Sequence, residues 1–173
     1  MAMLLFSMVA GSTLEGSIDL LTSIPTIILA VPAFINLAGD LAGVFTARVT
    51  SALFVGLIDN RFRPYSVLMS NLLGVMLVAL GGFSFLGFAL ALVNESLGIA
   101  ALNGSAIFTA ILVSGMITTV TMAVLGLWVA YTTFSRGLNP DNFTSPLTTS
   151  LGDALGTLLL VGTIRFLVIP PLL

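Results

Sequence analysis

The stretch PDNFTSPLTTSLGDALGTLLLVG, residues 140–162, holds an acidic residue, Asp153, inside a run of apolar and small residues. Such a run is long enough to cross a membrane, which takes about 20 mostly apolar residues. A carboxylate at the centre of a spanning helix costs roughly 2.5–3.5 kcal/mol, so it is expected to face a partner, a cavity or an ion. The stretch PAFINLAGDLAGVFTARVTS, residues 32–51, puts Asp40 in the same position. Two acidic residues on two spanning helices indicate a path for cations.

The composition around these stretches predicts an integral membrane protein. Hydrophobic residues make up 58% of the chain and charged residues only 7%, whereas charged residues are about 25% of a soluble domain. We expect one all-α transmembrane domain over residues 1–173, with no cytoplasmic regulatory domain. Its partner is the lipid bilayer. With no polybasic segment and no nucleotide-binding loop, neither nucleic acid nor nucleotide is expected as a partner.

The apolar runs predict five transmembrane helices. They cover about residues 1–16, 17–58, 65–93, 105–135 and 145–169. The first run is short for a full crossing, and the second is too long for one straight helix. Proline removes a backbone donor and clashes with the preceding turn, so Pro25 and Pro32 predict a long, proline-broken second helix with a bend near Pro32.

Arginine placement predicts the orientation in the membrane. Arg61 and Arg63 follow the second span, and Arg136 follows the fourth. Cytoplasmic loops collect basic residues, so both loops are expected in the cytoplasm. With five spans, a plasma-membrane protein of this kind has a cytoplasmic N-terminus and an external C-terminus. If the first segment does not span, the N-terminus lies outside.

Each of the two acidic stretches has a polar, small-residue face at helical spacing, because positions i, i+3, i+4 and i+7 share one side of a helix. The faces are Asn36, Gly39, Asp40, Gly43 and Ala47 on the second span, and Ser145, Thr149, Gly152, Asp153 and Gly156 on the fifth. Glycines four residues apart usually mark close helix packing. They also leave room and carbonyl oxygens beside a carboxylate, as a hydrated Mg²⁺ requires.

The candidate metal-site residues follow from these faces. They are Asp153, Asp40, Gly39, Asn36, Asp141, Thr149 and Gly152. Asn36 could instead form a hydrogen bond between two helices. Asp141 could be the N-cap of the fifth helix rather than part of a cation vestibule. Cysteine and histidine are absent, so a metal must be held by oxygen, which suits Mg²⁺ and other hard divalent cations. Arg48 lies ~12 Å beyond Asp40 along a straight helix, too far for direct contact within it.

These motifs resemble the membrane domain of MgtE-type magnesium transporters, and more closely the solute-carrier magnesium transporters of animals. The matching residues are Pro32-Ala33, Gly39-Asp40 and Arg48-Val49-Thr50 on the second span, then Pro140-Asp141-Asn142, Pro146 and Leu151-Gly152-Asp153 on the fifth. The resemblance implies a dimer around a central pore, in which Asp153 is the pore carboxylate and Gly39 and Asp40 line the same pore. Asp40 stands where the family has asparagine.

The animal relatives carry two such units in one chain, so the resemblance implies that this chain pairs with a copy of itself or with a homologous half. The expected function is therefore gradient-driven transport of Mg²⁺ or another divalent cation, by a non-enzymatic pore between the second and fifth helices. A membrane potential supplies about 4.6 kcal/mol per 100 mV to a doubly charged ion.

Two other functions remain open. An intramembrane aspartyl protease also needs two membrane aspartates, but it uses Tyr-Asp and Gly-x-Gly-Asp motifs, and here Leu37 and Ser150 occupy the first glycine place. A non-catalytic membrane subunit would pair the aspartates with arginines of a partner.

Overall fold

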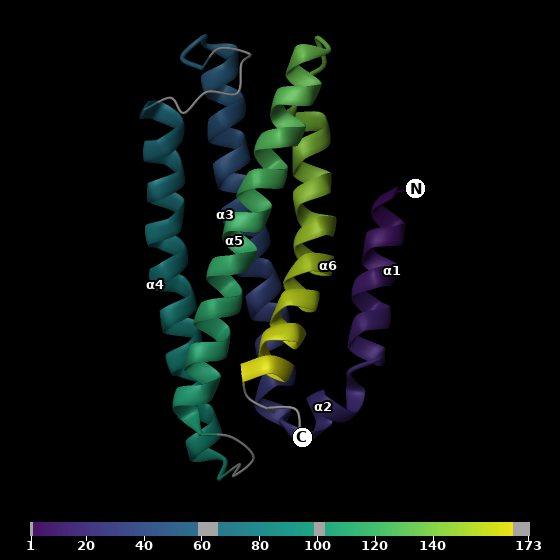
Figure 1. The fold of residues 1–173 in the computed structure, drawn as a ribbon, viewed down its shortest axis with the longest axis vertical. Coiled ribbons are helices and arrows are strands. Elements are labelled where there is room, and N and C mark those ends of the chain that lie inside the picture. Colours follow the sequence, from purple (N-terminus) through teal and green to yellow (C-terminus); the bar gives the residue numbers. More distant parts are fainter. Residues whose placement is uncertain (1, 59–65, 99–102, 168–173) are drawn as a thin grey trace.

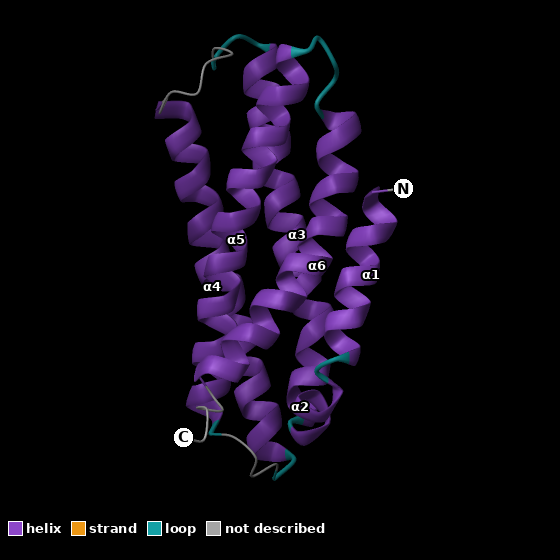
Figure 2. Ribbon diagram, turned by 45° about the vertical axis from the view of Figure 1, so that its right-hand side comes forward, coloured by secondary structure: helices purple, strands orange, loops and turns teal. Residues whose placement is uncertain are grey.

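The computed structural model describes residues 2–58, 66–98 and 103–167, and this part of the chain is folded into six α-helices without a strand (Figures 1 and 2). The helices are α1 (Ala2–Glu15), α2 (Ile18–Ser23), α3 (Pro25–Phe54), α4 (Ser66–Ser96), α5 (Gly104–Ser135) and α6 (Asp141–Leu167). Their order and approximate limits match the all-α prediction from the apolar runs.

Four of these helices, α3 to α6, are long and apolar enough to cross a membrane, with mean hydropathy from 1.4 to 2.3. The sequence predicted five spans. The remaining candidate, α1, has 14 residues, which makes it about 21 Å long at 1.5 Å per residue. A hydrocarbon core is about 30 Å thick, so α1 is too short to cross it upright.

Of the two prolines expected to interrupt the long second run, Pro25 follows a break between helices and Pro32 lies inside a helix. The residue between α2 and α3, Ile24, has non-helical backbone angles, and Pro25 is the first residue of α3. Proline suits that position because the first helical N–H needs no partner within the helix. At Pro32 the helix continues without interruption, so Pro32 does not break it, and the bend expected there stays a prediction. Neighbouring helices allow proline inside a membrane helix.

The four long helices alternate in direction. In Figure 1, α3 and α5 run upward, and α4 and α6 run downward. Helix α5 packs against α3, α4 and α6, while the short α1 packs against α6. The turns that follow α3 and α5 therefore lie at the same end, as the arginine placement requires. Arg61 and Arg63 themselves fall outside the described residues, and the orientation relative to the cytoplasm stays a prediction.

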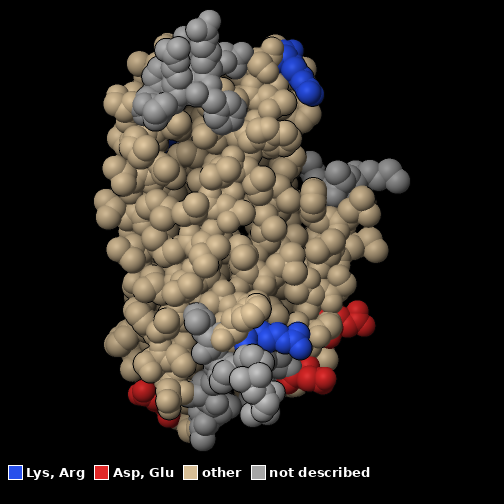
Figure 3. All heavy atoms as spheres, viewed as in Figure 1, with Lys and Arg blue, Asp and Glu red and all other residues tan. Residues whose placement is uncertain are grey.

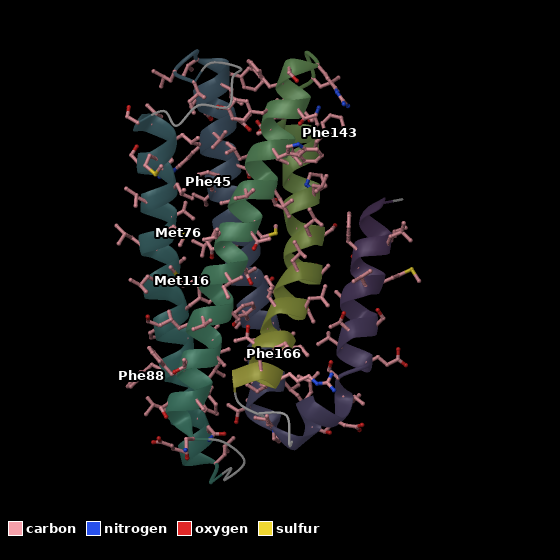
Figure 4. The ribbon with its side chains drawn as sticks, in the orientation of Figure 1. Phe45, Met76, Phe88, Met116, Phe143 and Phe166 are labelled. Atoms are coloured by element: carbon pink, nitrogen blue, oxygen red, sulfur yellow. The ribbon has the colours of Figure 1, made fainter. Side chains whose placement is uncertain are left out.

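The core is mainly aliphatic with a few aromatic side chains, and the outer surface is apolar. Phe34 of α3 and Phe83 of α4 are fully buried, with ring centroids 5.1 Å apart. On the outside of α4, Phe85 is 75% exposed and Phe88 points away from the bundle (Figure 4). On the face seen in Figure 3, charged side chains gather toward the two ends. An apolar exterior with charged ends is typical of a membrane-embedded bundle.

Several hydroxyl groups of α5 donate to backbone carbonyls of their own helix. In α5, Ser114, Thr118 and Thr121 donate to the backbone carbonyls of Ala110, Ser114 and Ile117, at 2.6, 2.8 and 2.8 Å. Hydrogen bonds of this kind are available to Ser and Thr within a helix, and they let these side chains lie in an apolar environment without another partner.

Candidate functional site

The site is organised by a backbone contact between α3 and α6. A Cβ atom added to Gly152 of α6 would lie 3.3 Å from the Cα of Gly39 of α3. Small residues such as glycine permit helices to approach closely. In each helix the residue that follows this glycine is an aspartate, Asp40 or Asp153. Both lie near the middle of their helices, so the crossing sets two carboxylates at the middle of the predicted membrane.

Beside this crossing lies a polar groove of about 450 Å³. Its lining comes from α3 and α6 only: Asn36, Gly39, Asp40, Gly43, Val44, Ser145, Thr148, Thr149 and Asp153. Asp40 is exposed and Asp153 is partly buried. Five of the seven candidate residues from the sequence, Asn36, Gly39, Asp40, Thr149 and Asp153, therefore line one groove.

The other two candidates lie elsewhere. Gly152 is buried at the helix crossing, where it contacts α3 and does not line the groove. Asp141 is exposed in the first turn of α6, and α6 begins at the upper end of the bundle in Figure 1. Its backbone N–H donates to Oδ1 of Asn139 at 3.0 Å. Asn139 thus supplies the capping oxygen, and Asp141 is a helical residue whose charge favours the helix N-terminus.

The glycine pairs of the two helices have different surroundings. On α6, Gly152 and Gly156 both face α3, and a Cβ on Gly156 would lie 3.4 Å from Cγ2 of Ile35. On α3, added Cβ atoms at Gly39 and Gly43 would meet no other atom within 4 Å. The α6 pair therefore serves packing, whereas the Cβ positions of the α3 pair are open and widen the groove.

Neither carboxylate is neutralised by an ion pair within the described part of the chain. Arg48, the nearest arginine to Asp40 along α3, instead donates to Oδ1 of Asn71 on α4 at 3.4 Å, and it lines a different groove. Asn36 forms no hydrogen bond to another described residue, so its helix–helix alternative gains no support. Two carboxylates and an amide are thus free to meet water or a cation.

The groove also contains hydroxyl oxygens. Thr148 and Thr149 both donate to the carbonyl oxygen of Ser145, at 3.0 and 3.1 Å. Because the donated proton points to the backbone, each threonine oxygen keeps lone pairs for water or a cation. Val44 and Thr148 line the groove but are not among the residues that the sequence pattern indicated. They lie one position beside the predicted faces, and a groove between two helices is wider than a single row of side chains.

The chemistry of the lining suits a hydrated cation better than a bare one. No group of three or more acidic, histidine or cysteine side chains lies together in the described residues. Mg²⁺ typically binds one or two carboxylates and keeps several of its waters. Hydroxyl, amide and carbonyl oxygens around two carboxylates can accept hydrogen bonds from that water shell.

Comparison with known proteins identifies the family of this chain. The sequence profile of the MgtE family, described as divalent cation transporters, matches residues 31–163. The chain belongs to the MgtE family. The matched region contains both groove helices over the length that carries the site, from Asn36 to Asp153. Helix α1 lies outside it.

Two proteins from animals are similar to a large part of this chain. Solute carrier family 41 member 3 of Mus musculus is 28% identical over 134 residues, which are 71% of this chain and 26% of the mouse protein. Solute carrier family 41 member 2 of Xenopus laevis is 25% identical over 145 residues, 78% of this chain and 24% of the frog protein. The chain thus spans about a quarter of the length of these relatives.

Proposed function

We propose that this protein transports Mg²⁺ down its electrochemical gradient, through a pore lined by α3 and α6. The observation that carries the proposal is the meeting of Asp40 and Asp153 in one groove, at the midpoint of two spanning helices. Buried charge in a membrane is costly and is typical of ion pathways. Membership of a divalent cation transporter family supports the cargo class.

The size of the groove favours a hydrated ion. Six waters occupy about 180 Å³ at ~30 Å³ each, and the groove holds about 450 Å³. An octahedral Mg²⁺ with its waters therefore fits, with room to move. Contacts through water are weaker than direct ligation, and weak contacts let an ion leave as well as enter.

The groove is lined by two helices of one chain, so a closed pore needs a second wall. We propose that a second copy, or a homologous half, supplies it across a two-fold axis, which is the commonest oligomer symmetry. Two aspartates from each wall would then surround the path. The greater length of the animal relatives is compatible with a second wall within their own chains.

Flux measurements on purified protein in vesicles test the proposal. Vesicles enclosing a Mg²⁺-sensitive dye are given external Mg²⁺ and an inside-negative potential. We expect the native chain to admit Mg²⁺ and Asp153→Asn to lose most of this flux. Asp19→Asn, on the exposed surface of α2, is the matched control and should retain it. Full flux through Asp153→Asn would remove the basis of the proposal.

The same vesicles address selectivity and driving force. Adding Ca²⁺, Mn²⁺ or Co²⁺ in competition ranks the divalent cargo. Collapsing the potential should slow entry, because about 4.6 kcal/mol per 100 mV is lost for a doubly charged ion. Entry that instead depends on an opposing Na⁺ or proton gradient would replace the gradient-driven pore with an exchanger.

A further inference from the structure

A second groove lies between α3 and α4, toward the end of the bundle where the turn after α3 begins. It has a volume of about 400 Å³. Its polar side chains are Arg48 and Ser51 of α3 and Asn71 of α4, and apolar walls such as Val55 and Val67 surround them. Nothing in the cation pathway uses this groove, because Arg48 points to α4 rather than to Asp40.

Arg48 has unused donors in this groove. Its guanidinium carries five N–H groups, and within the described residues its one hydrogen bond is the 3.4 Å contact with Oδ1 of Asn71. The Arg48 side chain is exposed. An arginine on a spanning helix is expected to pair with an anion or to reach the interface. The described residues supply no carboxylate to it, so an anion from outside the chain is the natural complement.

The depth of Arg48 identifies the source of that anion. At 1.5 Å per residue, its Cα lies about 13 Å from the midpoint of the 30-residue helix α3. The hydrocarbon core ends about 15 Å from its centre, and the headgroups lie beyond it. An arginine side chain extending toward the helix end therefore reaches the level of the lipid phosphates.

The surface of α4 next to the groove, toward the middle of the bundle, can accommodate the acyl chains of a lipid. On the face of α4 that carries Asn71, the next turns toward the middle of the bundle present Gly74 and Val78, both exposed. Neither has a polar side chain. A lipid whose phosphate lies at Arg48 would place its acyl chains along this face.

We propose that the groove between α3 and α4 binds the headgroup of an anionic phospholipid, with the phosphate held by Arg48. Arginine binds phosphate through paired N–H donors. The amide N–H groups of Asn71 and the hydroxyl of Ser51 provide further donors beside it.

Native mass spectrometry of the full chain, released from detergent, tests this site. Dioleoylphosphatidylglycerol is titrated against the native chain, Arg48→Gln and Arg165→Gln. The control, Arg165, is also an exposed arginine on a membrane helix, in the last turn of α6. We expect Arg48→Gln to raise the dissociation constant of the tightest lipid adduct by about tenfold or more, because a hydrogen bond to a charged group is lost. Arg165→Gln should leave that adduct unchanged.

Two further variants keep the test decisive if Arg48→Gln does not fold. Arg48→Lys retains the charge but not the paired donors, so it should bind the lipid more tightly than Arg48→Gln and less tightly than the native chain. Val67→Phe fills the apolar wall without touching the charge and should reduce binding.

The outcomes separate a lipid from other anions. Equal binding of dioleoylphosphatidylcholine would overturn the preference for an anionic lipid. Displacement of the adduct by millimolar inorganic phosphate would assign the site to a soluble anion instead. Unchanged lipid binding in Arg48→Gln, with a shifted balance of monomer and dimer, would make Arg48 a contact to a second copy and overturn the proposal.

Discussion

The backbone of Gly39 lies against Gly152, with 3.3 Å between the Gly39 Cα and the position a Gly152 Cβ would take. Because an aspartate follows each of these glycines, one helix crossing both joins α3 to α6 and brings the two carboxylates to a common groove. Packing and ion binding are therefore coupled at this point of the fold. Substitutions at neighbouring glycines should separate the two effects.

Gly152→Ala is expected to destabilise the protein. The added methyl group meets the backbone of Gly39 rather than a flexible side chain, so the helices must move apart. Overpacking of this kind costs about 1–3 kcal/mol. Gly39→Ala is the matched control, because its methyl group enters open space, and its effect should stay within about 0.5 kcal/mol. Unfolding of both variants in mixed micelles measures the difference, and equal stability of the two would contradict the contact.

Gly43→Val should block transport and leave the fold intact. Gly43 lines the groove, and an added Cβ there meets no atom within 4 Å. A valine therefore occupies the space of the hydrated ion without clashing with α6. Vesicle flux should fall severalfold while the thermal midpoint changes little. Gly74→Val, at an open position on α4, controls for a β-branched residue in a membrane helix. Normal flux through Gly43→Val would show that ions do not use this groove.

The sequence predicted the helices and most of the groove because apolar length and helical spacing are local properties. It did not predict which glycines pack and which leave space. Gly39 and Gly152 have the same spacing to a second glycine, and only the angle at which α3 meets α6 distinguishes their surroundings. The same limit applies to Thr148, which enters the groove because two helix surfaces converge there.

The ends and interruptions of the helices depend on capping hydrogen bonds and proline positions, which the sequence indicated only in part. Helix α6 begins at Asp141, four residues before the expected start at Ser145, because the Asn139 side chain accepts the Asp141 N–H. Both Pro25 and Pro32 were expected to interrupt the long second helix. Pro25 begins a helix, where no donor is needed, while tertiary packing keeps Pro32 within one.

Thr26→Val should weaken the contact between α3 and α4 without affecting transport. The Thr26 hydroxyl donates to Oδ1 of Asn94 at 2.9 Å, and both residues are buried. Hydrogen bonds between membrane helices are worth about 0.6 kcal/mol on average and up to ~1.7. Valine keeps the shape and removes the donor, so unfolding should become easier by an amount in this range. Thr109→Val is the control, because the exposed Thr109 hydroxyl bonds only to its own helix. An equal loss of stability in Thr109→Val would contradict a role for the interhelical hydrogen bond.

Mg²⁺ should protect the native chain against thermal unfolding, and Asp40→Asn should reduce this protection. A ligand that binds only the folded state stabilises it by RT ln(1 + [L]/Kd), about 2.7 kcal/mol at 100 times Kd. Asp40 faces the groove and has no ion pair among the described residues, so asparagine lowers cation affinity without removing an internal contact. The midpoint of thermal unfolding measured with a chelator should therefore be similar for the native chain and Asp40→Asn. The increase of this midpoint when Mg²⁺ is added should be smaller in the variant. Asp19→Asn should behave like the native chain, and an undiminished Mg²⁺ response in Asp40→Asn would place the bound ion away from α3.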